Sequence, residues 1–178
     1  MEKITTLDIE ASGLSPDSYP LEIGIVLPDD SSWCSLIEPA KTWDHWSKEA
    51  EALHQITREN IEHYGKAISE VAHTLNTLLK GKTVYSDCWV LDDRWLRKLY
   101  LEARMTPSFR LTDIMYILKE DDFLSWETTK SNVAKELNMH RHRATNDARI
   151  LQESFSRITH QRHYNNQHCN NIASMQKR

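Results

Sequence analysis

TTLDIEASGL at residues 5–14 has the pattern of a buried strand that carries two acids. Its apolar and β-branched residues run up to Ser12-Gly13, where glycine permits a sharp exit from the strand. Side chains two residues apart on a strand point to the same face, so Asp8 and Glu10 are expected side by side. Two neighbouring like charges are unfavourable unless a cation neutralises them, and a divalent cation is the usual partner of paired carboxylates. The stretch therefore predicts a metal site at the end of a strand.

An ordinary interpretation of the same pair stands beside this one. Glu10 can be solvated and Asp8 can cap a turn. In a chain with 26 acidic residues, about one Asp-x-Glu sequence is expected by chance. The pair becomes informative only if other residues can share its metal.

The composition describes one intracellular domain. At 178 residues, of which 39% are hydrophobic and 27% charged, the chain can bury one substantial core but is too short for two full domains. No apolar run approaches the length of about 18 residues that a membrane helix needs, and no signal-like segment precedes the first strand. The three cysteines form no C-x-x-C pair, which fits a reducing compartment and does not suggest structural zinc. We expect a cytoplasmic protein without a membrane partner.

The net charge of −4 disfavours tight binding to extended duplex nucleic acid, which depends on many phosphate contacts. Divalent cations held by a cluster of acids would reverse the local charge for a phosphate. An acidic, metal-dependent enzyme can therefore still bind short nucleic acid.

The order of predicted elements indicates an α/β fold with a mixed sheet. Two further strands, at 21–27 and 32–37, follow the first at short spacing, which favours antiparallel pairing. Later elements alternate between helix and strand, and the strands are predicted at 82–86 and 109–111. The helices are predicted within 40–62, at 67–79, from Asp92 onward, and at 113–118, 125–137 and 144–158. Residues 1–160 form the predicted domain. The polar segment 161–178 lacks periodicity and is predicted to be a flexible tail.

A third acid is expected just after the fourth strand. Asp92 has Trp95, Leu96 and Leu99 at helical offsets of three, four and seven, which places it on the inward face of a helix. Two alternatives stay open: Asp92 is only the N-cap of that helix, or Asp87 at the strand end supplies the carboxylate instead.

A histidine and a fourth acid occur together near the last helix. His142 precedes Asp147 by five positions, so the acid lies in the first turn of the helix and the histidine in the loop before it. A carboxylate fixed on the helix can hold a metal, while a loop histidine can take a proton from water. By itself this pair is also expected by chance.

These pieces, in this order, resemble the DEDDh family of 3′-5′ exonucleases, the group that includes ribonuclease T, oligoribonuclease and polymerase proofreading subunits. The likeness spans about residues 4–158, and it rests on LDIEASGLSP at 7–16, YPLEIG at 19–24, HQIT at 54–57 and HRA with DAR at 142–149. Two positions depart from the family pattern. Asp87-Cys88 stands where many members have His-Asn, and Gln55 replaces a usual glycine.

The resemblance implies a ribonuclease H-like fold, with a five-stranded mixed sheet of three antiparallel strands followed by parallel strands, flanked by helices. It also implies that Asp8, Glu10, Asp92 and Asp147 hold two Mg²⁺ or Mn²⁺ ions and that His142 is the general base. The implied reaction removes nucleoside 5′-monophosphates from the 3′ end of single-stranded RNA or DNA, with RNA slightly favoured. Residues implied in substrate binding are Ser12, Gly13, Leu14 and His54. A homodimer is compatible with the resemblance.

Two further questions are posed by the sequence. Of the six tryptophans, Trp43, Trp46 and Trp89 are candidates for stacking on bases, whereas the helical spacing around Trp95 favours a core position.

The alternative function is a non-catalytic nucleic-acid-binding or scaffold domain that has kept the fold. The complete set of acids and histidine argues against it, although a fold alone does not determine function.

Overall fold

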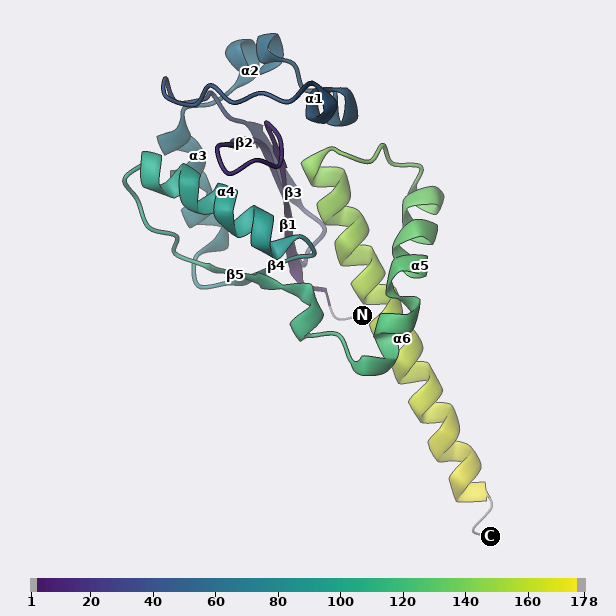
Figure 1. The fold of residues 1–178 in the computed structure, drawn as a ribbon. Coiled ribbons are helices and arrows are strands. Elements are labelled where there is room, and N and C mark those ends of the chain that lie inside the picture. The colour runs from purple at the N-terminus through teal and green to yellow at the C-terminus, as the bar shows by residue number, and fades with distance from the viewer. Residues whose placement is uncertain (1–2, 176–178) are drawn as a thin grey trace.

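A mixed five-stranded sheet lies at the centre of the structure, a computed structural model that describes residues 3–175 and the side chains of residues 3–162 and 164 (Figure 1). The strands are β1 (Thr5–Ala11), β2 (Pro20–Val26), β3 (Ser32–Leu36), β4 (Thr83–Ser86) and β5 (Arg110–Asp113). Their order across the sheet is β3-β2-β1-β4-β5. β2 is antiparallel to β1 and β3, while β4 runs parallel to β1 and β5 runs parallel to β4. The predicted fold class and topology are confirmed.

Helices cover both faces of the sheet. They are α1 (Lys48–His54), α2 (Arg58–Tyr64), α3 (Ile68–Leu79), α4 (Trp89–Glu102), the 3₁₀ turn η1 (Ile114–Tyr116), α5 (Glu120–Leu137) and α6 (Ala144–Met175). On one face, Leu7 and Ile9 of β1 pack in a buried cluster with α3 and α4. On the other face, the hydroxyl of Thr6 donates to the carbonyl of Ala148 in α6, at 2.7 Å. Figure 1 shows α5 lying alongside α6.

The alternation of side chains along β1 determines on which face of the sheet its two acids lie. Asp8 and Glu10 share the face of Thr6, because side chains on a strand alternate between faces. They therefore face the α6 side of the sheet, while the apolar residues between them fill the core on the other side.

Several helices differ in length from the sequence prediction. The helix predicted at 113–118 is only the 3₁₀ turn η1, which Asp113 caps by accepting from the backbone N–H of Met115. α5 begins five residues earlier than predicted, at Glu120. α6 continues to Met175, well past the predicted end near Ile158. The flexible tail at 161–178 falls mostly on residues outside the described side chains, and it stays a prediction.

No helix in the described part of the chain is both long enough and apolar enough to cross a membrane.

Candidate active site

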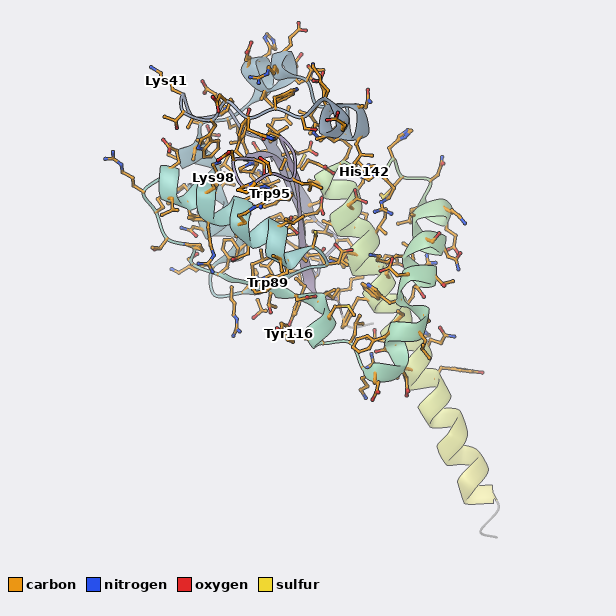
Figure 2. The ribbon with its side chains drawn as sticks, viewed as in Figure 1. Lys41, Trp89, Trp95, Lys98, Tyr116 and His142 are labelled. Atoms are coloured by element: carbon orange, nitrogen blue, oxygen red, sulfur yellow. The ribbon has the colours of Figure 1, made fainter. Side chains whose placement is uncertain are left out.

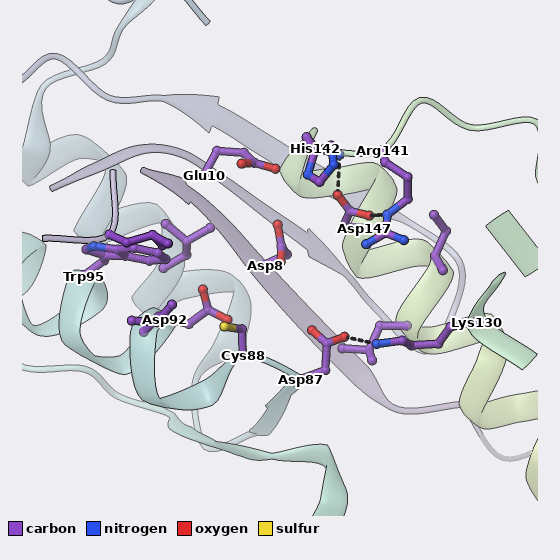
Figure 3. Close-up of a pocket in the computed structure, with 15 residues that line it drawn as sticks. Asp8, Glu10, Asp87, Cys88, Asp92, Trp95, Lys130, Arg141, His142 and Asp147 are labelled. Atoms are coloured by element: carbon purple, nitrogen blue, oxygen red, sulfur yellow. Dashed lines mark hydrogen bonds and ion pairs between the residues drawn. The ribbon is translucent and has the colours of Figure 1, made fainter. Parts of the chain in front are cut away.

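A cleft of about 390 Å³ opens where β1 and the first turns of α4 and α6 meet (Figure 3). It brings together all five residues predicted to be catalytic, which are distant in the sequence. The charged and titratable residues that line it are Asp8, Glu10, Asp87, Cys88, Asp92, Lys130, Arg141, His142 and Asp147.

Close packing of β2 against α6 brings the fourth acid to the first two. Gly24 of β2 lies opposite Asp8 of β1 in the antiparallel register. A Cβ atom at Gly24 would lie only 2.2 Å from the backbone nitrogen of Thr145, so only glycine permits this approach. The first turn of α6 can therefore reach the sheet, and Asp147 lies in that turn.

Asp92 is a buried acid in the first turn of α4, with only 1% of the residue exposed. Cys88 occupies the N-cap position and makes no side-chain cap hydrogen bond, so Asp92 is not the N-cap. Instead, the hydroxyl of Ser86 at the end of β4 donates to the Asp92 carboxylate. The inward orientation predicted from the helical pattern is confirmed.

Asp87 also lines the cleft, but its surroundings differ. The residue is exposed, and its carboxylate accepts from the Lys130 ammonium of α5 at 2.7 Å. One candidate third acid is thus buried beside Ser86, and the other is paired with a cation at the edge of the cleft.

Asp8, Glu10 and Asp92 are electrostatically unfavourable as carboxylates. Burial raises the pKa of Asp8 well above its usual value, and the neighbouring Asp92 and Glu10 carboxylates raise it further. Burial also raises the pKa of Asp92, although the Ser86 hydrogen bond opposes the shift. The pKa of Glu10 rises to about 7, chiefly through burial and then through Asp147. A bound cation would favour the charged form of all three.

The loop before α6 holds His142 in an uncommon backbone conformation. Its φ is +65°, in the left-handed region that residues other than glycine rarely adopt. The backbone N–H of His142 donates to Asp147 Oδ2 at 2.6 Å. Fixed contacts on both sides of His142 are needed to maintain such a conformation, which typically costs about 1–3 kcal/mol.

Glu22 of β2 supplies the contacts on the other side. It is 2% exposed and lies directly opposite Glu10 in the sheet. Its two carboxylate oxygens accept from the Arg143 guanidinium, with Nε at 3.1 and 3.2 Å, and Oε2 also accepts from the backbone N–H of Ala144 at 2.9 Å. Glu22 therefore ties the two residues that follow His142 to the sheet.

Three side chains are close enough to share one metal ion. Ligand atoms of Glu10, His142 and Asp147 all lie within 4.8 Å of one another. Oxygen and imidazole ligands suit ions such as Mn²⁺ and Zn²⁺, and carboxylates suit Mg²⁺. The Oδ1 atom of Asp147 pairs with the Arg141 guanidinium, so this cation partly compensates the negative charge of Asp147 (Figure 3).

The predicted substrate-binding residues lie around the loop after β1. Leu14 is 73% exposed, and it lines both the cleft and an adjoining pocket of about 340 Å³. Gly13 and the buried His54 line that second pocket. Ser12 lines neither, because its hydroxyl accepts from the backbone N–H of Tyr19 at 3.1 Å and contacts His45 Nδ1 at 3.0 Å.

Residues of α4 hold the same loop in place (Figure 2). Trp95 Nε1 donates to the Ser18 hydroxyl at 2.8 Å, and Lys98 Nζ donates to the carbonyl of Asp17 at 2.6 Å. Trp95 is 5% exposed, which confirms its predicted core position. Trp43 is also buried and stacks on Tyr19, with ring centroids 5.3 Å apart.

Solved structures of exonuclease I match this arrangement of strands and helices. The chain has the exonuclease I fold. The match to exonuclease I from Methylocaldum szegediense has a TM-score of 0.68 at 15% identity, over 90% of this chain and 40% of that one. The match to the zinc-bound E. coli exonuclease I complex with single-stranded DNA has a TM-score of 0.66 at 14% identity, over 90% and 41%.

The likeness to exonuclease I is one of fold, and it covers part of those proteins. This chain spans about two fifths of the length of the exonuclease I structures. No protein-family model matches the sequence, and no curated protein matches it. The predicted ribonuclease H-like fold is confirmed, and the residues of the cleft carry the functional argument.

Three charged residues at or beside the cleft were not predicted to belong to the site. Glu22 belongs to a quoted motif, but its contacts depend on a partner more than a hundred positions away. Arg141 adjoins His142, and its charge was a signal that could have been used. Lys130 has no sequence signal, since only the packing of α5 beside α6 brings it to the cleft.

Proposed function

We propose that this protein is a metal-dependent 3′-5′ exonuclease that acts on single-stranded nucleic acid. The observation that carries the proposal is the convergence of four acids and one histidine in a cleft on an exonuclease I fold. Burial and repulsion from neighbouring carboxylates make Asp8 and Asp92 poor isolated anions and good cation ligands.

Asp8, Glu10, Asp92 and Asp147 are the proposed ligands of two Mg²⁺ or Mn²⁺ ions. When bound, such ions supply Lewis acidity at the scissile phosphate and lower the pKa of water. Asp92 is preferred over Asp87 because Asp92 is buried beside Asp8 and Glu10, whereas Asp87 is exposed at the edge of the cleft. Ser86 orients the Asp92 carboxylate through its hydroxyl.

His142 is the proposed general base. Its ring nitrogen would take the proton of the attacking water while in-line attack releases a nucleoside 5′-monophosphate. Asp147 and Glu22 support this role, since they hold the backbone on both sides of the ring. The ring lies close to the carboxylates of Glu10 and Asp147, two of the proposed metal ligands.

Leu14, Gly13 and His54 are proposed to contact the terminal nucleotide. Leu14 supports this because its exposed side chain lies between the acidic cleft and the adjoining pocket. Burial lowers the pKa of His54, so its ring would be neutral near pH 7 and would contact a base or sugar without adding charge.

The first prediction concerns the acid of α6. Replacing Asp147 by Asn should abolish Mg²⁺-dependent cleavage of single-stranded oligonucleotides, because it removes one ligand charge while keeping the side-chain shape. Asp121→Asn is the matched control, since Asp121 is exposed in the first turn of α5 and should leave cleavage unchanged. Retained activity in the Asp147 variant would overturn the site assignment.

Matched RNA and DNA oligonucleotides decide the substrate. E. coli exonuclease I was solved with single-stranded DNA and with a dA16 oligonucleotide, which supports trying DNA beside the RNA that the sequence resemblance slightly favours. No cleavage of any strand of either kind would count against the proposed function.

A further inference from the structure

Two cations line the acidic cleft, and they face different acids. Arg141 pairs with Asp147, a proposed metal ligand. Lys130 pairs with Asp87, the acid that the proposed metal site does not need. Figure 3 shows Lys130 pointing toward Asp87, with Asp92 on the opposite side of Asp87. The proposed metal site therefore does not explain why Lys130 lies in the cleft.

The Lys130 side chain is held in a defined position. Only 15% of it is exposed, and its Nζ lies 5.8 Å from the centroid of the Trp126 ring. Asp87 Oδ2 lies 2.7 Å from this Nζ, and Glu127 Oε1 lies 3.2 Å from it. A flexible lysine side chain loses conformational entropy when it binds a ligand. Because the Lys130 side chain is already ordered in the folded protein, it would lose less on binding.

The ammonium group has a donor to spare within the described contacts. A lysine ammonium has three hydrogens and no acceptor. Asp87 and Glu127 account for two of these hydrogens among the contacts of the described residues. The third can donate to a phosphate oxygen without breaking either ion pair.

The shape of the cleft sets the position of that phosphate along a strand. The adjoining pocket shares Glu10, Leu14 and Trp95 with the cleft, and it does not include Asp87 or Lys130. Figure 3 places Asp8 between Glu10 and Asp87. A strand whose 3′ nucleotide lies at Leu14 and whose scissile phosphate lies at the acids would direct its next phosphate toward Lys130.

We propose that Lys130, held by Asp87, binds the phosphate on the 5′ side of the scissile bond. This inference rests on the proposed function for the direction of the strand. It assigns Asp87 as a positioning residue for Lys130, and it explains why an acidic cleft keeps a nearly buried lysine at one edge.

The test compares two substrates that differ in this phosphate. A single-stranded oligonucleotide has phosphates beyond the scissile one, whereas the p-nitrophenyl ester of thymidine 5′-monophosphate has only the phosphodiester that is cleaved. Lys130→Met should raise KM for the oligonucleotide about tenfold and leave kcat and KM for the ester unchanged. Lys130→Arg should restore most of the oligonucleotide affinity.

Lys66→Met is the matched control, because Lys66 forms an exposed ion pair with Glu70 away from the cleft. Thermal unfolding of each variant checks folding. If Lys130→Met changes both substrates equally, or behaves as Lys66→Met does with the oligonucleotide, the inference is wrong. If the wild-type protein cleaves neither substrate, the proposed function fails separately.

Equilibrium binding tests the inference even without turnover. Affinity for a labelled oligonucleotide is measured with Ca²⁺ at several salt concentrations. Loss of one phosphate contact to a single strand should reduce the slope of log affinity against log salt by about 0.7. An unchanged slope and affinity in Lys130→Met would overturn the proposed contact.

Discussion

Single residues in the cleft differ mainly in what compensates their charge. Asp92 is buried and Asp8 is half-buried, and the pKa values of both are raised, while Asp87 and Asp147 have cationic partners. The helical spacing of Asp92 could predict its inward direction, because that spacing is local. It could not separate Asp92 from Asp87, since the partner of Asp87 lies 43 positions away on α5.

Paired substitutions of these two acids test the assignment. Asp92→Asn should lower kcat with the nucleotide ester by more than about a hundredfold, as loss of a ligand should exceed the effect of losing an outer contact. Asp87→Asn should keep kcat with the ester within about threefold, since in this account it holds Lys130 and no metal. The reverse ranking, measured in initial rates with Mg²⁺, would make Asp87 the ligand.

Among the secondary-structure elements, the contact between β2 and the start of α6 positions the histidine. Gly24 permits the close approach, and Glu22 binds Arg143 and Ala144. The strand and the helix could each be predicted from periodicity. Their contact could not be predicted, because a pattern of burial does not specify which loop a buried Glu22 will bind.

Glu22→Gln tests this contact. The amide keeps the shape but loses the charge-assisted pair with Arg143, so we expect a loss of about 1–3 kcal/mol in unfolding free energy. We also expect kcat to fall about tenfold while oligonucleotide KM stays unchanged, because His142 loses its support. Glu70→Gln, in an exposed ion pair, is the control. A stability loss with unchanged kcat would show that Glu22 is only structural.

For the whole molecule, folding gathers carboxylates that the unfolded chain keeps apart. The pKa of Glu10 rises from 4.5 to about 7 on folding, so the folded state binds the proton more tightly than the unfolded state. The stabilisation that this provides is complete below about pH 4.5 and is lost as pH rises through 7. Metal-free protein should therefore become less stable between pH 5.5 and pH 8.

Thermal unfolding with and without Mg²⁺ measures this effect. The Tm of metal-free protein should fall by several degrees over that range, since about 1 kcal/mol shifts Tm by about 2–4 °C in a domain of this size. Added Mg²⁺ should reduce the fall because it favours the charged acids. Glu10→Gln should flatten the curve. A Tm that rises with pH equally in wild type and variant would contradict the electrostatic account.

The architecture was largely predictable because its signals are periodic and local. Strands and antiparallel hairpins follow from alternation and short spacing. The family resemblance, and not periodicity alone, implied the set of four acids and one histidine that line the cleft. The length of α6 was not predicted, since the segment after Ile158 is rich in Asn, Gln and His and lacks an apolar stripe. The position of Lys130 in the cleft was not predicted either, because α5 brings Lys130 there only through its packing against α6.

The direction and product of cleavage test the central claim most directly. One single-stranded oligonucleotide is labelled at its 5′ end in one sample and within its 3′-terminal nucleotide in another, and both are incubated with protein and Mg²⁺. The account predicts a descending ladder from the 5′ label and immediate release of a labelled nucleoside 5′-monophosphate from the 3′ label, both lost on adding EDTA. Internal cuts, release from the 5′ end or cleavage that persists in EDTA would contradict it.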